Sequence, residues 1–273
     1  MPDHSSSTVN RDLLVSRGWC QGSILPSSIE NHTQKLTEIR RDEHDFFFIL
    51  SQDCNVLSDS YEKEPFVEVL CAHSVPSPNK MMLNGRNPRE YHFSLSDEEP
   101  CRHYRILASE RECLNRRDLE SASPSGTIPK SDIKQIAIWM ALRYTRESFP
   151  DELNRRFQQL KKKYKDALKN IRKLLEDSSV TDTILDFYLD TQDEELTENK
   201  KYDLTIHVEI KPEIYQDIEK RSQITELMDA IEGLLNTPES RIEASCELEP
   251  SNKITLEEVR RYKRWSIFDD LSY

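Results

Sequence analysis

The chain has 273 residues, with 38 Lys and Arg against 50 Asp and Glu, so its formal net charge is −12. This length suffices for one large domain or two ordinary ones, and 36% hydrophobic residues can supply a core. The negative charge argues against a protein that binds nucleic acid over its whole surface, although it allows a local basic patch. Neither GxGxxG nor GxxxxGK[ST] occurs, so we expect no nucleotide binding by these loops.

The sequence predicts a cytoplasmic protein without a membrane partner. No apolar run approaches the roughly 18 residues that span a bilayer, and the Ser-rich segment 1–11 reads as a disordered tail rather than a signal peptide. The cysteines form no CxxC motif, which favours reduced thiols over a disulfide framework. They lie at Cys20, Cys54, Cys71, Cys101, Cys113 and Cys246.

The stretch 45–73 organises the first part of the chain. The uncharged run FFFIL at 46–50 predicts a strand buried on both faces. It leads into the polar stretch SQDCN at 51–55, of the composition that turns and sites favour. A second strand is expected at 66–71, after Pro65. Because short connections make sequential strands neighbours, we expect Asp53 and Cys54 to lie beside Glu68 at one end of a sheet.

Further alternation of apolar and polar residues predicts strands at 90–95 and 102–108. Short alternating strands separated by turns are typical of an antiparallel sheet or small barrel. We therefore expect a β-rich domain over residues 12–120. A Ser/Pro/Gly-rich segment at 121–129 then marks a domain boundary.

Helical periodicity follows and predicts a helical hairpin at 130–190. The first helix starts near Ser131 and Asp132 and ends at Pro150. Apolar residues of the second helix recur at heptad-like spacing, which predicts a packed seam. They are Leu153, Phe157, Leu160, Tyr164, Ala167, Ile171 and Leu174.

The last segment, 202–273, predicts a small α+β domain. Strict alternation at 202–210 and at 242–248 indicates two strands, and an apolar-faced helix from Pro212 joins them. Thr255 and Glu258 form a capping-box pattern before a short last helix. The whole chain is therefore expected to be an α+β protein.

Several short motifs lie along the chain: GWCQG at 18–22, SQDC at 51–54, EPxVE at 64–68 and WxAxRYxRxxFP at 139–150, with Trp265 and Leu271-Ser272 near the end. Together they resemble a family of bacterial proteins of unassigned function that occur on mobile elements and near antiphage-defence genes. Relatives have Asp where this chain has Asn55, which weakens a metal-binding role for that position. The resemblance implies a setting in a multiprotein defence system, with a partner from the same operon, but no reaction.

Two enzymatic interpretations centre on residues 51–55. Cys54 is a candidate nucleophile if His73 or His44 serves as its base and Asp53 orients that base, because a thiol needs a neighbouring base or cation to become reactive. The alternative is that Cys54 is a small apolar filler at a strand end.

A divalent-metal nuclease would instead use clustered carboxylates, here Asp53, Glu64 and Glu68. The Lys that usually follows such an acid by two residues is absent, since Val69 and Leu70 follow Glu68. That absence weakens this interpretation.

Two C-x-H pairs raise a zinc hypothesis. Cys71 with His73, and Cys101 with His103, each place two ligands on one strand face, and four such groups would complete a tetrahedral zinc site. C-x-H is not the common zinc-knuckle spacing, so ordinary structural roles remain the alternative.

The segment 155–173 carries nine Lys and Arg against one acid, Asp166. Spacings of four and seven residues place its candidate phosphate-binding residues on one side of a continuous helix. They are Arg155, Lys162, Lys169 and Lys173. The alternatives are a solvated helix face or pairing with the acidic segment 190–198.

We therefore expect an accessory subunit that binds a protein partner, with an enzyme at residues 51–55 or a nucleic-acid-binding helix as competing functions.

Overall fold

The computed structural model describes residues 11–30, 39, 42–95, 101–145, 148–192 and 194–267. It divides into two compact units, Met1–Arg143 and Tyr144–Tyr273, and the predicted α+β class is confirmed. The division falls inside the predicted hairpin 130–190, so the two expected helices belong to different units and do not form a domain. The expected tail lies outside the described residues apart from Arg11.

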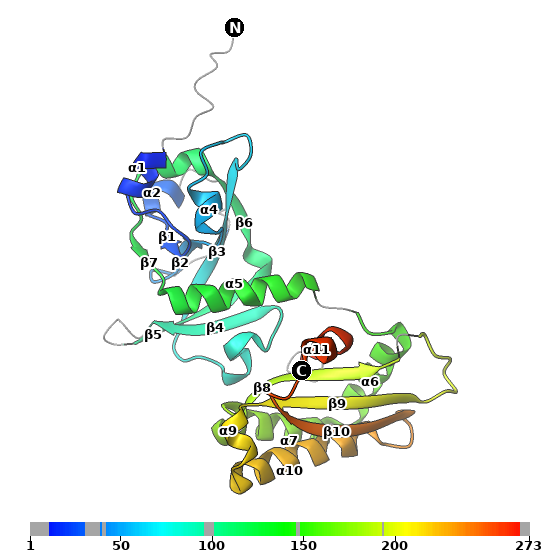
Figure 1. Ribbon diagram of the computed structural model, residues 1–273. Coiled ribbons are helices and arrows are strands. Elements are labelled where there is room, and N and C mark those ends of the chain that lie inside the picture. The colour runs from blue at the N-terminus through cyan, green and yellow to red at the C-terminus, as the bar shows by residue number, and fades with distance from the viewer. Residues whose placement is uncertain are drawn as a thin grey trace. The chain divides into compact units, whose positions relative to one another are not determined.

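Unit 1 is built on a curled antiparallel sheet (Figure 1), in the strand order β4-β5-β3-β2-β1-β7, with β6 also pairing with β3. The long strand β3 connects the sheet because it pairs with β2 along one edge and with β6 and then β5 along the other. The strands are β1 (Ser23–Ile24), β2 (Phe46–Ile49), β3 (Phe66–Val75), β4 (Glu90–Leu95), β5 (Arg102–Leu107), β6 (Glu112–Asn115) and β7 (Gly126–Thr127).

Alternation along β2 and β3 produces an apolar core on each face of this sheet, as the uncharged run 46–50 predicts. Phe47 belongs to one core, with Trp19 and Val69, while Phe48 belongs to the other, with Trp139. Helix α5 (Lys130–Thr145) covers the second core. The remaining helical elements are α1 (Arg11–Ser16), α2 (Ser27–Glu30), α4 (Asp53–Val56), η1 (Lys80–Gly85), η2 (Ala108–Glu110) and η3 (Arg116–Ser121).

Unit 2 contains a second sheet in the order β10-β9-β8-β11. Strands β9 and β10 are parallel and joined through α10, as the strand–helix–strand pattern predicts, whereas β8 and β11 pair antiparallel. Its strands are β8 (Ile184–Thr191), β9 (Tyr202–Ile210), β10 (Ile242–Pro250) and β11 (Lys263–Arg264). Its helices are α6 (Asp151–Lys163), α7 (Lys165–Glu176), α8 (Ser178–Thr181), α9 (Pro212–Tyr215), α10 (Ile218–Leu235) and α11 (Leu256–Arg261).

Helices lie on both sides of the sheet of unit 2. Helices α7 and α10 lie together on one side, and α11 lies on the other (Figure 1). The apolar face includes Leu204, Ile206 and Val208, all buried. The expected single helix 151–174 is in fact two helices, because Tyr164 has φ −111° and ψ 53°, outside the helical range. Within the described residues, no helix is long and apolar enough to cross a membrane.

Candidate functional site

The turn after β2 is fixed to two other segments of unit 1. At its start, Ser51 Oγ accepts the backbone N–H of Glu68 at 2.8 Å, which pins the turn to β3. At the beginning of α4, Asp53 Oδ1 accepts the backbone N–H of Gln21 at 2.6 Å. The Gln21 side chain in turn donates to the carbonyl of Leu50 at 2.7 Å. The motifs at 18–22 and 51–54 are therefore neighbours in space.

These two segments form one wall of an open cavity of about 560 Å³, and α5 forms the opposite wall. The residues from α5 recur every three or four positions, so they belong to one face of the helix. We call this cavity the α5 groove. Its lining consists of Cys20, Gln21, Gln52, Asp53, Thr127, Lys130, Ile133, Lys134, Ala137, Ile138 and Ala141.

The two ends of the α5 groove differ in chemistry. Lys130 and Lys134 stand at the first turns of α5, and within the described part of the chain neither has an ion pair or hydrogen bond from its side chain. Further along the helix, Ala137 and Ala141 are small, and Ile138 is 45% exposed. One end of the groove therefore offers the positive charge of two lysines, and the other offers exposed apolar surface.

The described side chains around this turn do not support either enzymatic interpretation. Cys54 is exposed, and its thiol lies 3.1 Å from Asn55 Oδ1 rather than beside a histidine. The backbone of Glu68 lies beside the turn, as expected, but its side chain pairs with Arg111 at 3.2 Å. Among the described residues, no cluster of three metal-ligating side chains includes Asp53 or Glu68. Among the residues that the structure describes, neither a Cys54–histidine dyad nor a carboxylate metal site is therefore assembled there.

His73 takes part in a different arrangement, at the opposite end of the β2–β3 pair. Its Nδ1 lies 2.8 Å from Asp45 Oδ2, and its Nε2 lies 2.5 Å from Glu110 Oε2. Burial by itself raises the pKa of Asp45, but hydrogen bonds from the backbone of Ser74 and Asp42, with His73, together hold that pKa below its ordinary value. The Asp45 carboxylate is thus a fixed, charged partner of the imidazole.

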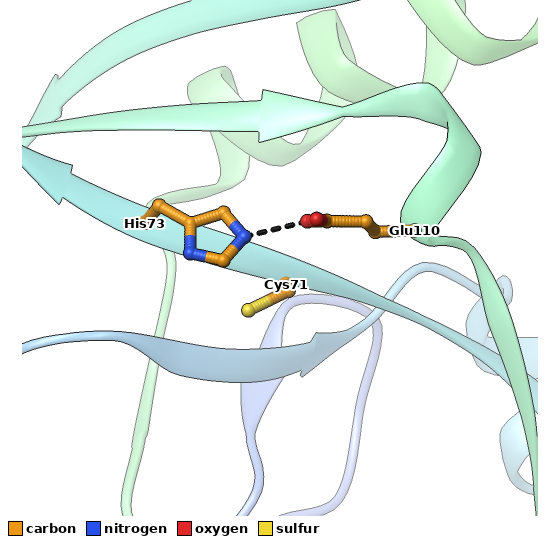
Figure 2. Close-up of side chains that lie close together, drawn as sticks. All are labelled: Cys71, His73 and Glu110. Carbon is orange, nitrogen blue, oxygen red and sulfur yellow. Dashed lines mark hydrogen bonds and ion pairs between the residues drawn. The ribbon is translucent and has the colours of Figure 1, made fainter. Parts of the chain in front are cut away.

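Cys71 completes this arrangement (Figure 2), because it shares a face of β3 with His73. The ligand atoms of Cys71, His73 and Glu110 all lie within 4.8 Å of one another. Cys101 and His103 do not join them among the described residues: Cys101 is exposed, and His103 Nδ1 lies 2.8 Å from Ser94 Oγ. The structure therefore assembles half of the predicted zinc set and adds Glu110, which the sequence analysis missed.

The basic segment of unit 2 does not form the continuous face that its spacing predicts. The break at Tyr164 separates Arg155 and Lys162, on α6, from Lys169 and Lys173, on α7. Arg155 pairs with Glu152 at 2.6 Å and with Glu198 at 3.3 Å. For Arg155, the structure thus shows the expected alternative, pairing with acidic residues of the 190–198 segment.

The acidic segment also caps α6. The carboxylate oxygens of Glu195 accept the backbone N–H groups of Asp151 and Glu152, at 2.9 and 2.6 Å. These are two of the first N–H groups of the helix, which have no acceptor inside it. The negative charge of Glu195 is also stabilised there by the positive end of the helix dipole. The acidic segment is therefore structural at this point.

Comparisons of the chain with protein-family models, with curated proteins and with solved structures found no match.

Proposed function

We propose that the chain is a binding subunit that holds a short extended segment of a partner protein in the α5 groove. The observation that supports this proposal is that Lys130 and Lys134, which have no ion pair among the described residues, lie on the same helix face as an exposed apolar strip. In a chain of net charge −12, two lysines side by side favour an acidic ligand group.

The dimensions of the groove suggest a peptide. Its α5 wall runs from Lys130 to Ala141, which at 1.5 Å per residue is about 16 Å. An extended peptide advances about 3.3 Å per residue, so roughly five residues would fill that length. We propose a segment with an apolar side chain between Ala137 and Ala141 and an acidic side chain near Lys130 and Lys134. Recognition of an apolar anchor beside a charged group is a common mode of peptide binding.

The resemblance to proteins of defence neighbourhoods suggests that the partner is encoded in the same operon, within an antiphage system. The experiment measures fluorescence anisotropy of labelled six-residue peptides, in which one apolar residue is followed by two acidic ones. A double charge reversal, Lys130→Glu with Lys134→Glu, should weaken binding at least tenfold, because a tenfold loss corresponds to only about 1.4 kcal/mol.

A matched control uses Lys169→Glu with Lys173→Glu, which has the same spacing and charge change on exposed positions of α7. This control should leave peptide affinity within about twofold, since it alters the net charge equally but not the groove. Equal loss in both double variants, or no binding by any acidic peptide, would refute the proposal. Binding of small anions in place of peptides would assign the groove to a metabolite.

A further inference from the structure

We propose that Cys71, His73 and Glu110 form a zinc site and that Asp45 orients the histidine. This site is independent of the α5 groove and differs from the four-ligand set that the sequence predicts. Figure 2 shows the His73 ring pointing at Glu110, with the Cys71 side chain alongside. The three donor atoms already lie within 4.8 Å of one another without a metal.

The surroundings of Asp45 determine which ring nitrogen faces the metal. Asp45 Oδ1 accepts the backbone N–H of Ser74 at 2.7 Å, and its Oδ2 accepts that of Asp42 at 2.9 Å. These two N–H groups fix the Asp45 carboxylate, which accepts a hydrogen bond from His73. The donor is Nδ1, so Nδ1 carries the proton. Nε2 is then the nitrogen that faces Glu110, and it can present either a proton or a lone pair there. A carboxylate behind a metal-binding histidine is the usual outer-shell arrangement in zinc proteins.

The set of donor atoms favours zinc over other common ions. A cysteine thiolate and an imidazole suit a borderline-soft ion, whereas Mg²⁺ and Ca²⁺ prefer oxygen ligands alone. Zinc binds nitrogen and carboxylate oxygen at about 2.0–2.2 Å in tetrahedral geometry, which requires about 3.3 Å between the two ligand atoms. The present Nε2–Oε2 distance is 2.5 Å, so Glu110 must withdraw by about 0.8 Å.

The exposures of Glu110 and His73 permit that adjustment. The side chain of Glu110 is 24% exposed and lies at the end of the short helix η2, whereas that of His73 is 10% exposed and is fixed by Asp45. Glu110 is thus the ligand that can move and the side from which an ion enters. The same side would accommodate a water molecule as the fourth ligand.

Without a metal, the His73 ring lies between two carboxylates, with Nδ1 at Asp45 and Nε2 at Glu110. The experiment separates the two states. The purified full-length protein is stripped with a chelator and titrated with Zn²⁺ in competition with a chromophoric chelator. Co²⁺ then replaces Zn²⁺, because a thiolate–cobalt bond produces a charge-transfer absorption that reports cysteine coordination. We expect one ion per chain and that absorption.

Variants assign the ligands. Cys71→Ser should abolish the charge-transfer absorption, and Asp45→Asn should weaken metal affinity about 10–100-fold while leaving that absorption in place at saturating Co²⁺. Glu110→Gln, at the partly exposed position, should also weaken affinity at least tenfold, and it keeps the test valid if Cys71→Ser does not fold. Cys113→Ser, at an exposed position of β6, is the matched thiol control and should change neither readout.

A second cluster provides the competing assignment. His207, Glu247 and Glu249 of unit 2 also lie within 4.8 Å of one another, but they include no thiol. Metal binding that survives Cys71→Ser unchanged and is lost in Glu247→Gln would move the site to unit 2 and overturn the proposal. Failure of the stripped protein to bind either ion would identify the His73 contacts as a metal-free ion-pair network.

Discussion

The buried residue Arg116 should contribute several kcal/mol to the stability of unit 1, about 3–5 kcal/mol as a member of a buried charged network. Its side chain is fully buried at the start of η3, beneath the loop that follows α4. The guanidinium donates to the backbone carbonyls of Asn55 at 3.0 Å, Ser58 at 2.6 Å and Ser60 at 2.7 Å. It also lies 4.9 Å from the centre of the Tyr61 ring. The Arg116 side chain therefore holds the segment 55–60 in place by its hydrogen bonds.

Replacing Arg116 with Ala removes these bonds and leaves partly buried carbonyl oxygens without this donor. Hydrogen bonds that involve a charged group contribute about 1.5–3 kcal/mol each, but neighbouring bonds are not additive. Breaking a buried charged network by removing one member typically costs about 3–5 kcal/mol. We therefore expect Arg116→Ala to lower the free energy of unfolding of unit 1 by about 3–5 kcal/mol. At about 3 °C per kcal/mol for a unit of this size, Tm should fall by about 10–15 °C.

Urea unfolding followed by tryptophan fluorescence measures this change. Trp19 and Trp139 report on unit 1, so a Trp265→Phe background isolates its signal from that of unit 2. The neighbouring Arg117 is exposed and stacks on the same tyrosine at 4.4 Å, so Arg117→Ala is the control and should cost less than about 1 kcal/mol. Arg116→Lys should recover little, because an ammonium group cannot address several carbonyls in the plane of a guanidinium. A loss below about 1 kcal/mol for Arg116→Ala, or full recovery by Lys, would refute this reasoning.

Three further predictions concern single side chains. Burial, with nearby carboxylates, raises the pKa of Glu209, so its ionisation lowers the free energy of unfolding of unit 2 as pH rises through that pKa. Glu209→Gln should therefore stabilise unit 2 in urea unfolding at pH 7, and this gain should disappear below pH about 4.5, where the glutamate is protonated in both the folded and the unfolded state. Thr255→Ala removes a complete capping box and should cost about 1 kcal/mol, with the loss of α11 visible as faster amide exchange there. Trp139→Phe removes a 2.7 Å bond from the indole N–H to the buried carbonyl of Asn87 and should cost about 1–3 kcal/mol in thermal unfolding of unit 1, whereas no change would show that water satisfies the carbonyl.

Local periodicity predicts much of this fold. The uncharged run 46–50 predicts a strand buried on both faces, and Phe47, Phe48 and Ile49 are all 0% exposed. Such a pattern can be read from sequence because each face is determined by residues two positions apart. The same reasoning predicts β9 and β10, whose polar and apolar residues alternate regularly.

Elements with local irregularities cannot be predicted from periodicity in this way. Strand β8 was not predicted, because a β-bulge between Ile184 and Asp186 shifts the register and interrupts the alternation. The break between α6 and α7 at Tyr164 was not predicted, because no Gly or Pro lies there and the apolar spacing continues across it.

The candidate sites show the same limit at longer range. Cys71 and His73 were predicted as ligands because two residues two positions apart on a strand share a face. Glu110 was not, because it is 37 residues from His73 in the sequence and approaches only through the pairing of β5 and β6 with β3. Residue spacing can predict two ligands on the same strand, whereas the position of Glu110 depends on the order of the strands in the sheet.

The two proposed sites lie at opposite ends of the antiparallel β2–β3 pair. Phe46 pairs with Ala72 next to the Asp45–His73 contact, and Ile49 pairs with Val69 next to Ser51 and the α5 groove. From residue 45 to residue 51, six steps of about 3.3 Å separate the ends by about 20 Å. Substitutions more than 7–10 Å apart, without shared partners, act additively. Zinc binding at His73 and peptide binding at the α5 groove should therefore be separable, so that a variant that loses one of them keeps the other.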